Sequence, residues 1–135
     1  MLDQRKLLTA APQTTVFDAS QQMMAQGSGA VLVIQDERLI GIFTERDAVF
    51  RVIAQGRDAR TTVLGDVMTP SPKTIDSNHS FGYAMLLMHE NGFRHLPVME
   101  NGKPVGIVSA RNALDPDLEE FVSESQRRKY LRESG

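Results

Sequence analysis

The strongest constraint on the fold is that the sequence repeats itself. Residues 41–47 read GIFTERD and residues 106–112 read GIVSARN, 65 positions later. At the same offset, residues 15–27 align with 80–92 and residues 30–48 align with 95–113, without a gap. The identical pairs are Thr9/Thr74, Ala19/Ala84, Met23/Met88, Gly27/Gly92, Val33/Val98, Gly41/Gly106, Ile42/Ile107, Arg46/Arg111 and Ala48/Ala113. One register held over this length predicts that the chain folds as two copies of one structural unit.

Each copy opens with the signals of a helix. A hydroxyl residue, Thr15 or Ser80, precedes apolar residues at helical spacing. A glycine, Gly27 or Gly92, follows where a helix C-cap belongs. We therefore expect an amphipathic helix between each hydroxyl and its glycine.

Two apolar runs separated by a polar turn come next and predict a β-hairpin. The runs are residues 30–34 and 39–43 in the first copy, and 95–99 and 104–108 in the second. A second helix is predicted after the hairpin, as far as about Gly56 in the first copy. With a short extended piece near Thr9 and Thr74, the predicted fold is α/β. It consists of two pseudo-symmetric β-α-β-β-α repeats packed together through their sheets.

The predicted organisation is two repeats, a connector and a final helix. The first repeat is expected at 1–60, a connector with Pro70 and Pro72 at 61–72, the second repeat at 73–115 and a C-terminal helix at 116–135. Neither repeat is expected to be stable alone, because about 50 residues with two or three strands make a marginal core.

Composition excludes several classes of protein. The net charge is −2, without the basic field that nucleic-acid-binding proteins show. There is no cysteine, so disulfides and thiolate metal sites are excluded. No apolar run approaches the ~20 residues that span a bilayer. These features predict a cytoplasmic protein that binds neither nucleic acid nor membrane.

The GIFTERD motif has two interpretations. Thr44 and Asp47 are spaced as a capping box, in which each side chain binds the other residue's backbone N–H. The same spacing suits a nucleotide site, because a helix start attracts phosphate and a carboxylate accepts both hydroxyls of a ribose. The two interpretations can hold together.

The sequence resembles a tandem pair of cystathionine-β-synthase-type domains, the CBS pair or Bateman module. The resemblance covers about residues 7–115. It rests on GIFTERD and GIVSARN, on FRHLPV, on DVMTP at the junction and on the two-repeat order. In that family the pattern glycine–apolar–apolar–Thr/Ser–x–x–Asp marks an adenosine-nucleotide pocket, and the Asp holds the ribose. The resemblance implies two clefts at the interface of the repeats, each drawing on both.

Carried over to this chain, the resemblance implies a first cleft and a second one. The first would use Thr44, Arg46 and Asp47 with Thr74, Asp76, Arg94, His95 and Pro97. The second would use Ser109, Arg111 and Asn112 with Thr9 and the stretch Gly29, Ala30 and Val31. Because Asn112 replaces the carboxylate, and charge-assisted hydrogen bonds are roughly twice as strong as neutral ones, we expect the Asp47 cleft to bind nucleotide better.

Other chemistry has little support in the sequence. His79, His89 and His95 lack the spacing of a metal site, and no acidic cluster completes a ligand shell. Ser109 with His95 lacks a nucleophile elbow and an orienting acid. We expect no metal site and no enzyme activity.

Residues 81–91 read FGYAMLLMHEN and are apolar nearly all round. Tyr83, Leu86 and Leu87 stand where the first copy has Asp18, Gln21 and Gln22. This second apolar stripe packs either on the final helix or on a second copy of the chain. The resemblance favours an isologous homodimer.

These observations predict a regulatory module that binds AMP, ADP, ATP or NAD between its repeats and relays occupancy to an effector protein. No cofactor is obligatory. The alternative is a constitutive dimerisation scaffold without a small-molecule ligand.

Overall fold

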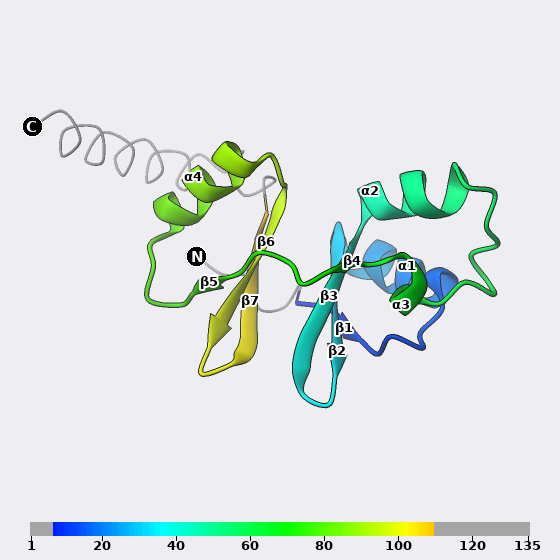
Figure 1. Cartoon of the computed structure of the whole chain (residues 1–135), viewed down its shortest axis with the longest axis horizontal. Coiled ribbons are helices and arrows are strands. Elements are labelled where there is room, and N and C mark those ends of the chain that lie inside the picture. Colours follow the sequence, from blue (N-terminus) through cyan, green and yellow to red (C-terminus); the bar gives the residue numbers. More distant parts are fainter. Residues whose placement is uncertain (1–6, 110–135) are drawn as a thin grey trace, which may run out of the picture. The chain divides into compact units, whose positions relative to one another are not determined.

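The structure, a computed structural model, describes residues 7–109, which form two compact units that meet in the sequence at Pro72 and Lys73. The first unit contains β1 (Thr9–Ala10), α1 (Val16–Gln26), β2 (Ala30–Gln35), β3 (Arg38–Thr44), α2 (Glu45–Asp47), the π-helix η2 (Ala48–Ile53), α3 (Leu64–Val67) and β4 (Thr69–Pro70) (Figure 1). The second contains β5 (Ile75–Asp76), α4 (Phe81–Asn91), β6 (His95–Glu100) and β7 (Lys103–Ser109).

The first unit has a four-stranded sheet in the order β1-β2-β3-β4. β1 runs parallel to β2, and the other pairs are antiparallel. The β2–β3 hairpin aligns Val31 with Phe43, and these two side chains face the helices together with Val33. Because neighbours along a strand alternate between faces, this alignment fills one face of the sheet with large apolar groups.

Helices cover that face of the first sheet. α1 contributes Val16, Ala19 and Met23 to the same buried cluster, which also takes in Val52 of η2 and Leu64 and Val67 of α3. The segment 61–72 is therefore more than a link between two units. It adds a short helix to the first core and a strand to the first sheet, where β4 pairs with β3 through Gly41 and Ile42.

Within residues 73–109, the second unit repeats the helix and the hairpin of the first. Its sheet has the order β5-β6-β7, with β5 parallel to β6 and β6 antiparallel to β7. α4 packs on this sheet through Phe81, Ala84 and Met88, which form one buried cluster with Leu96 and Val98 among others. The two units thus confirm the predicted mixed α/β fold with the same helix and hairpin in each.

The caps of the two long helices are as predicted. Thr15 Oγ1 accepts the backbone N–H of Asp18, and Ser80 Oγ accepts that of Tyr83, each at 3.1 Å. Gly27 and Gly92 end the helices in the left-handed conformation, with φ of 63° and 74°. A side chain is disfavoured there, which explains the glycine in both copies.

The hairpins also match in their irregularities. A register shift lies between Val33 and Ile34 in the first hairpin and between Val98 and Met99 in the second, 65 positions later. Both turns place two residues at positive φ, as a type I′ turn requires. These are Asp36 and Glu37 in the first hairpin and Asn101 and Gly102 in the second.

The helix after the first hairpin differs in detail from the prediction. It begins at Glu45, but from Ala48 to Ile53 it has π-helical hydrogen bonding, and Ala54 N–H donates to the Val49 carbonyl at 2.8 Å. The assigned helix ends at Ile53, short of Gly56, which lies in the following turn with a φ of 70°. The predicted C-terminal helix at 116–135 lies outside the described residues.

No helix among the described residues has the length and apolar character needed to cross a lipid bilayer.

Candidate functional site

Thr44 marks the point where β3 ends and a helix begins. Its backbone is extended, with φ −120° and ψ 168°, and Glu45 is already helical. Thr44 Oγ1 accepts the N–H of Asp47 at 3.2 Å, and the Asp47 carboxylate accepts the N–H of Thr44 at 2.9 Å. This is the capping box that the spacing predicted.

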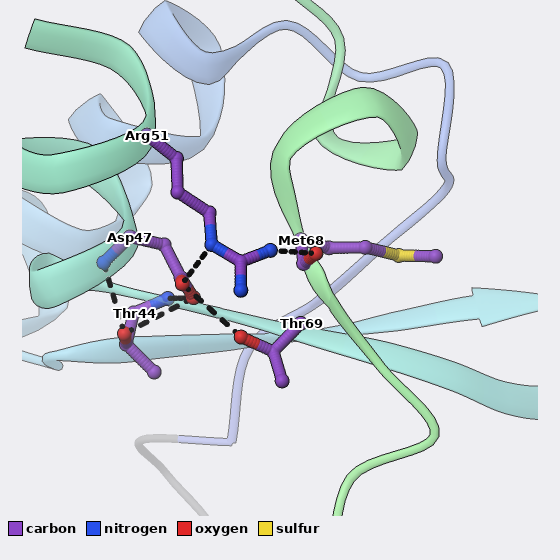
Figure 2. Close-up of polar contacts among 5 residues, drawn as sticks. All are labelled: Thr44, Asp47, Arg51, Met68 and Thr69. Atoms are coloured by element: carbon purple, nitrogen blue, oxygen red, sulfur yellow. Dashed lines mark hydrogen bonds and ion pairs between the residues drawn. The ribbon is translucent and has the colours of Figure 1, made fainter. Parts of the chain in front are cut away.

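The Asp47 carboxylate has donors on both of its oxygens. Oδ2 accepts the Thr44 N–H and also the Thr44 hydroxyl at 3.1 Å. Oδ1 accepts the hydroxyl of Thr69, in β4, at 3.1 Å and forms an ion pair with Arg51 Nε at 3.4 Å. Figure 2 shows these side chains converging on Asp47 from β3, η2 and β4.

Arg51 links Asp47 to the main chain of the segment before β4. Its Nη1 donates to the Met68 carbonyl at 2.9 Å while its Nε faces Asp47 (Figure 2). Asp47 is only 7% exposed, whereas the Arg51 side chain is 49% exposed. Solvent screening therefore weakens the ion pair. The position of the carboxylate depends mainly on its hydrogen bonds with the neutral donors of Thr44 and Thr69.

The structure places the other residues predicted for the first cleft on separate elements. Arg46 is exposed on α2, and its guanidinium lies over the ring of Phe50, 5.5 Å from the centroid. Thr74 and Asp76 are exposed at β5, and Asp76 Oδ1 accepts the N–H of Asn78 at 3.1 Å. Arg94 is exposed just before β6, His95 begins that strand half-buried, and Pro97 is buried within it.

Most residues predicted for the second cleft lie on strands of the two sheets. Thr9 is exposed on β1, Ala30 and Val31 are buried at the start of β2, and Ser109 is half-buried at the end of β7. Arg111 and Asn112 lie outside the described residues.

Cross-strand pairing brings some of the predicted residues together within each unit. Ala30 pairs with Thr44 in the first hairpin, and His95 pairs with Ser109 at the equivalent place in the second. In both repeats, the first residue of the first hairpin strand therefore lies beside the hydroxyl residue that ends the second hairpin strand.

The three residues predicted for a dimer interface differ in exposure. Tyr83 is 40% exposed and stacks on His79, with ring centroids 4.6 Å apart. Leu86 is half-buried, and Leu87 packs against the core of its own unit.

Sequence reasoning missed two residues at Asp47. Arg51 follows Asp47 by four positions, the spacing of an ion pair on one helix face, so a signal was present. Thr69 lies in the segment 61–72, whose Pro70 and Pro72 indicated a connector, and no local pattern reveals that its hydroxyl reaches Asp47.

Within residues 7–109, no group of three or more His, Asp or Glu side chains is arranged to hold a metal ion. The described part of the site offers a carboxylate, two hydroxyls and a guanidinium. This set suits hydrogen bonding to a polar ligand.

Known proteins share both the sequence pattern and the fold. The CBS domain family matches this chain twice, at residues 2–54 and 64–117. The meiotically up-regulated gene 70 protein of Schizosaccharomyces pombe is 36% identical over 94% of this chain, which spans 19% of that protein. The chain spans at most 65% of the next curated relatives as well.

Solved structures agree with this assignment. A protein with CBS domains from Burkholderia ambifaria is 34% identical, with a TM-score of 0.76, over 88% of this chain and 84% of that one. The CBS domain protein PAE2072 from Pyrobaculum aerophilum, solved in complex with AMP, is 19% identical, with a TM-score of 0.77, over 89% of this chain and 93% of that one. At that identity the likeness concerns the fold. The chain belongs to the CBS domain family, as a tandem pair of CBS domains.

Proposed function

We propose that this chain is a cytoplasmic regulatory module that binds an adenosine nucleotide in clefts between its two CBS repeats. AMP, ADP, ATP and NAD are the candidate ligands. The observation that carries the proposal is the position of Asp47, which ends the GIFTERD motif beside the hydroxyls of Thr44 and Thr69. A carboxylate in such a place can accept the two hydroxyls of a ribose.

The fold supports the same ligand class. PAE2072 has this fold and binds AMP. In the first cleft of the present chain, Thr44, Arg46 and Asp47 would act with Thr74, Asp76, Arg94, His95 and Pro97. In the second, Ser109, Arg111 and Asn112 would act with Thr9, Ala30 and Val31. An amide at Asn112 makes weaker bonds to a diol than a carboxylate does, so the Asp47 cleft is the stronger site.

The module would act without catalysis of its own. A ligand that binds one arrangement of the repeats better than another shifts the population toward that arrangement. An effector protein that distinguishes the two arrangements then responds to the ligand, and the coupling is reciprocal. The effector lies outside the residues described in the structure.

We also propose a homodimer formed through α4. In the apolar stripe Tyr83 is exposed and Leu86 is half-buried, while Leu87 packs against the core of its own unit. The equivalent positions of α1 carry Asp18, Gln21 and Gln22, so the stripe is particular to the second repeat.

One observation favours the alternative of a ligand-free scaffold. A carboxylate offers about four acceptor positions, and the chain's own donors approach both Asp47 oxygens. In a scaffold Asp47 would serve as a helix cap and a tie to β4, and nothing else.

Replacing Asp47 by Ala distinguishes the two functions. Unfolding temperature would be measured for the wild type and Asp47→Ala with and without millimolar AMP, ADP, ATP and NAD. A ligand at about 100 times its dissociation constant adds about 2.7 kcal/mol of stability. For a nucleotide sensor, the wild type gains several degrees with at least one ligand and the variant gains none. For a scaffold, Asp47→Ala loses about 0.5–2 kcal/mol through the missing cap, and no ligand shifts either protein.

A further inference from the structure

The contacts of Asp47 divide into two sets, one on each carboxylate oxygen. The first set belongs to the capping box, in which Oδ2 accepts the N–H and the hydroxyl of Thr44, three residues away. The second set reaches Oδ1 from the Thr69 hydroxyl, 22 residues away, and from Arg51, four residues away. We call Thr69, Arg51 and Oδ1 of Asp47 the latch.

We propose that the latch is closed in the ligand-free chain and that a ribose diol opens it by replacing Thr69 and Arg51 on Asp47. This inference rests on the proposed function. It adds that nucleotide binding at Asp47 is coupled to the contacts of the chain segment before the second unit. The diol supplies two hydroxyl donors, the same number of donors that Thr69 and Arg51 present to Oδ1 of Asp47.

The diol would displace the latch rather than the capping box. Displacing Oδ2 would leave the Thr44 N–H without its acceptor and break the carboxylate half of the capping box, and a hydrogen bond of this kind is worth about 0.5–1.5 kcal/mol. The Arg51 contact is weaker, since the ion pair spans 3.4 Å and the side chain is 49% exposed. Thr69 Oγ1, half-buried on a two-residue strand, can rotate its hydroxyl to another acceptor.

Opening the latch would loosen the segment that leads to the second unit. Arg51 Nη1 donates a hydrogen bond to the Met68 carbonyl at 2.9 Å, and Thr69 is one of the two residues of β4. β4 pairs with β3 only through Gly41 and Ile42, and the second unit begins at Lys73, three residues after Pro70. Ligand occupancy at Asp47 would thereby be coupled to the attachment of the chain between the repeats.

The test compares nucleotide affinity in the wild type and in Thr69→Val. Valine keeps the shape and the strand preference of threonine but removes the competing hydroxyl. The probes are AMP and 2′,3′-dideoxy-AMP, which lacks the diol. The matched control is Thr61→Val, because Thr61 is an exposed threonine whose hydroxyl reaches only the Asp58 carbonyl, at 3.4 Å.

Loss of one hydrogen bond to a charged group predicts that Thr69→Val binds AMP about tenfold more tightly. The dideoxy compound should show no such gain, and Thr61→Val should match the wild type. Equal or weaker AMP binding by Thr69→Val, with binding by the wild type intact, would overturn the latch and leave the nucleotide site standing. Absence of binding by both proteins to AMP, ADP, ATP and NAD alike would overturn the proposed function, and the latch with it.

Amide hydrogen exchange gives a second readout that does not depend on affinity. The Ser71 N–H donates to the Ile40 carbonyl at 3.1 Å, at the end of β4. Its exchange should quicken in Thr69→Val without ligand, and in the wild type when AMP is added. An unchanged rate on AMP saturation of the wild type would refute the coupling.

Discussion

The side chain of Met68 occupies the space in which any other residue at position 41 would carry its Cβ. A Cβ placed on Gly41 would lie 2.9 Å from Met68 Cγ, and still closer to the sulfur. Gly41 does not adopt the left-handed backbone of Gly27 or Gly92, so conformational freedom does not explain this glycine. It is explained by the approach of the β4 segment to β3, which also brings Thr69 to Asp47.

Gly41→Ala should therefore destabilise the protein through crowding. Forcing an extra methyl group into a packed site typically costs about 1–3 kcal/mol. Urea unfolding of Gly41→Ala, Met68→Ala and the double variant would measure the effect. The double variant should be more stable than the sum of the single losses predicts, because Met68→Ala makes room for the methyl group. Strict additivity would show that Met68 is not the obstacle.

The turn of the first hairpin carries a residue that disfavours its conformation. Glu37 has a φ of 65°, where the second hairpin has Gly102 at 79°. A side chain in this region costs roughly 1–2 kcal/mol, partly offset by the greater flexibility of glycine in the unfolded chain. Glu37→Gly should raise the free energy of unfolding by about 0.5–1 kcal/mol.

The reciprocal change, Gly102→Glu, should lower the free energy of unfolding by a similar amount. Denaturant titrations of the two variants provide the comparison. Effects of the same sign in both would contradict the equivalence of the two turns.

The dimer prediction can be tested with residues that the other repeat already uses. Tyr83→Asp with Leu86→Gln places on α4 the side chains that α1 carries at positions 18 and 21. These changes make the exposed Tyr83 and the half-buried Leu86 polar and leave the buried Phe81, Ala84 and Met88 unchanged, so sedimentation equilibrium should find a monomer. Met24→Gln is the control, since Met24 is 78% exposed on α1, and it should leave the dimer intact. A dimer that survives the double change excludes α4 as the interface.

Local patterns predicted the repeated part of the fold well. Caps at Thr15 and Ser80, C-caps at Gly27 and Gly92, and both hairpins follow from residues close together in the sequence. Such elements depend on near neighbours, so a repeat at a fixed offset reveals them twice.

The environment of Asp47 could be predicted only in part. The capping box followed from a three-residue spacing, whereas the contact with Thr69 spans 22 residues. Pro70 suggested a connector because proline lacks the N–H that a strand interior requires. Its place in β4 is consistent with the short edge strand on which a sheet tolerates proline.

The most direct test of the central claim is calorimetric titration of AMP into the wild type and Asp47→Asn, each stripped of co-purified ligand. Asparagine is the residue at the equivalent position of the second repeat, Asn112, and its carbonyl can still cap the helix. The nucleotide site predicts that the wild type binds AMP, and that Asp47→Asn keeps its unfolding temperature within a few degrees while losing about tenfold or more in affinity, as expected when a charged acceptor becomes neutral. Equal affinity in the two proteins, or a wild type that binds none of AMP, ADP, ATP and NAD, would contradict the assignment of Asp47 as the ribose acceptor.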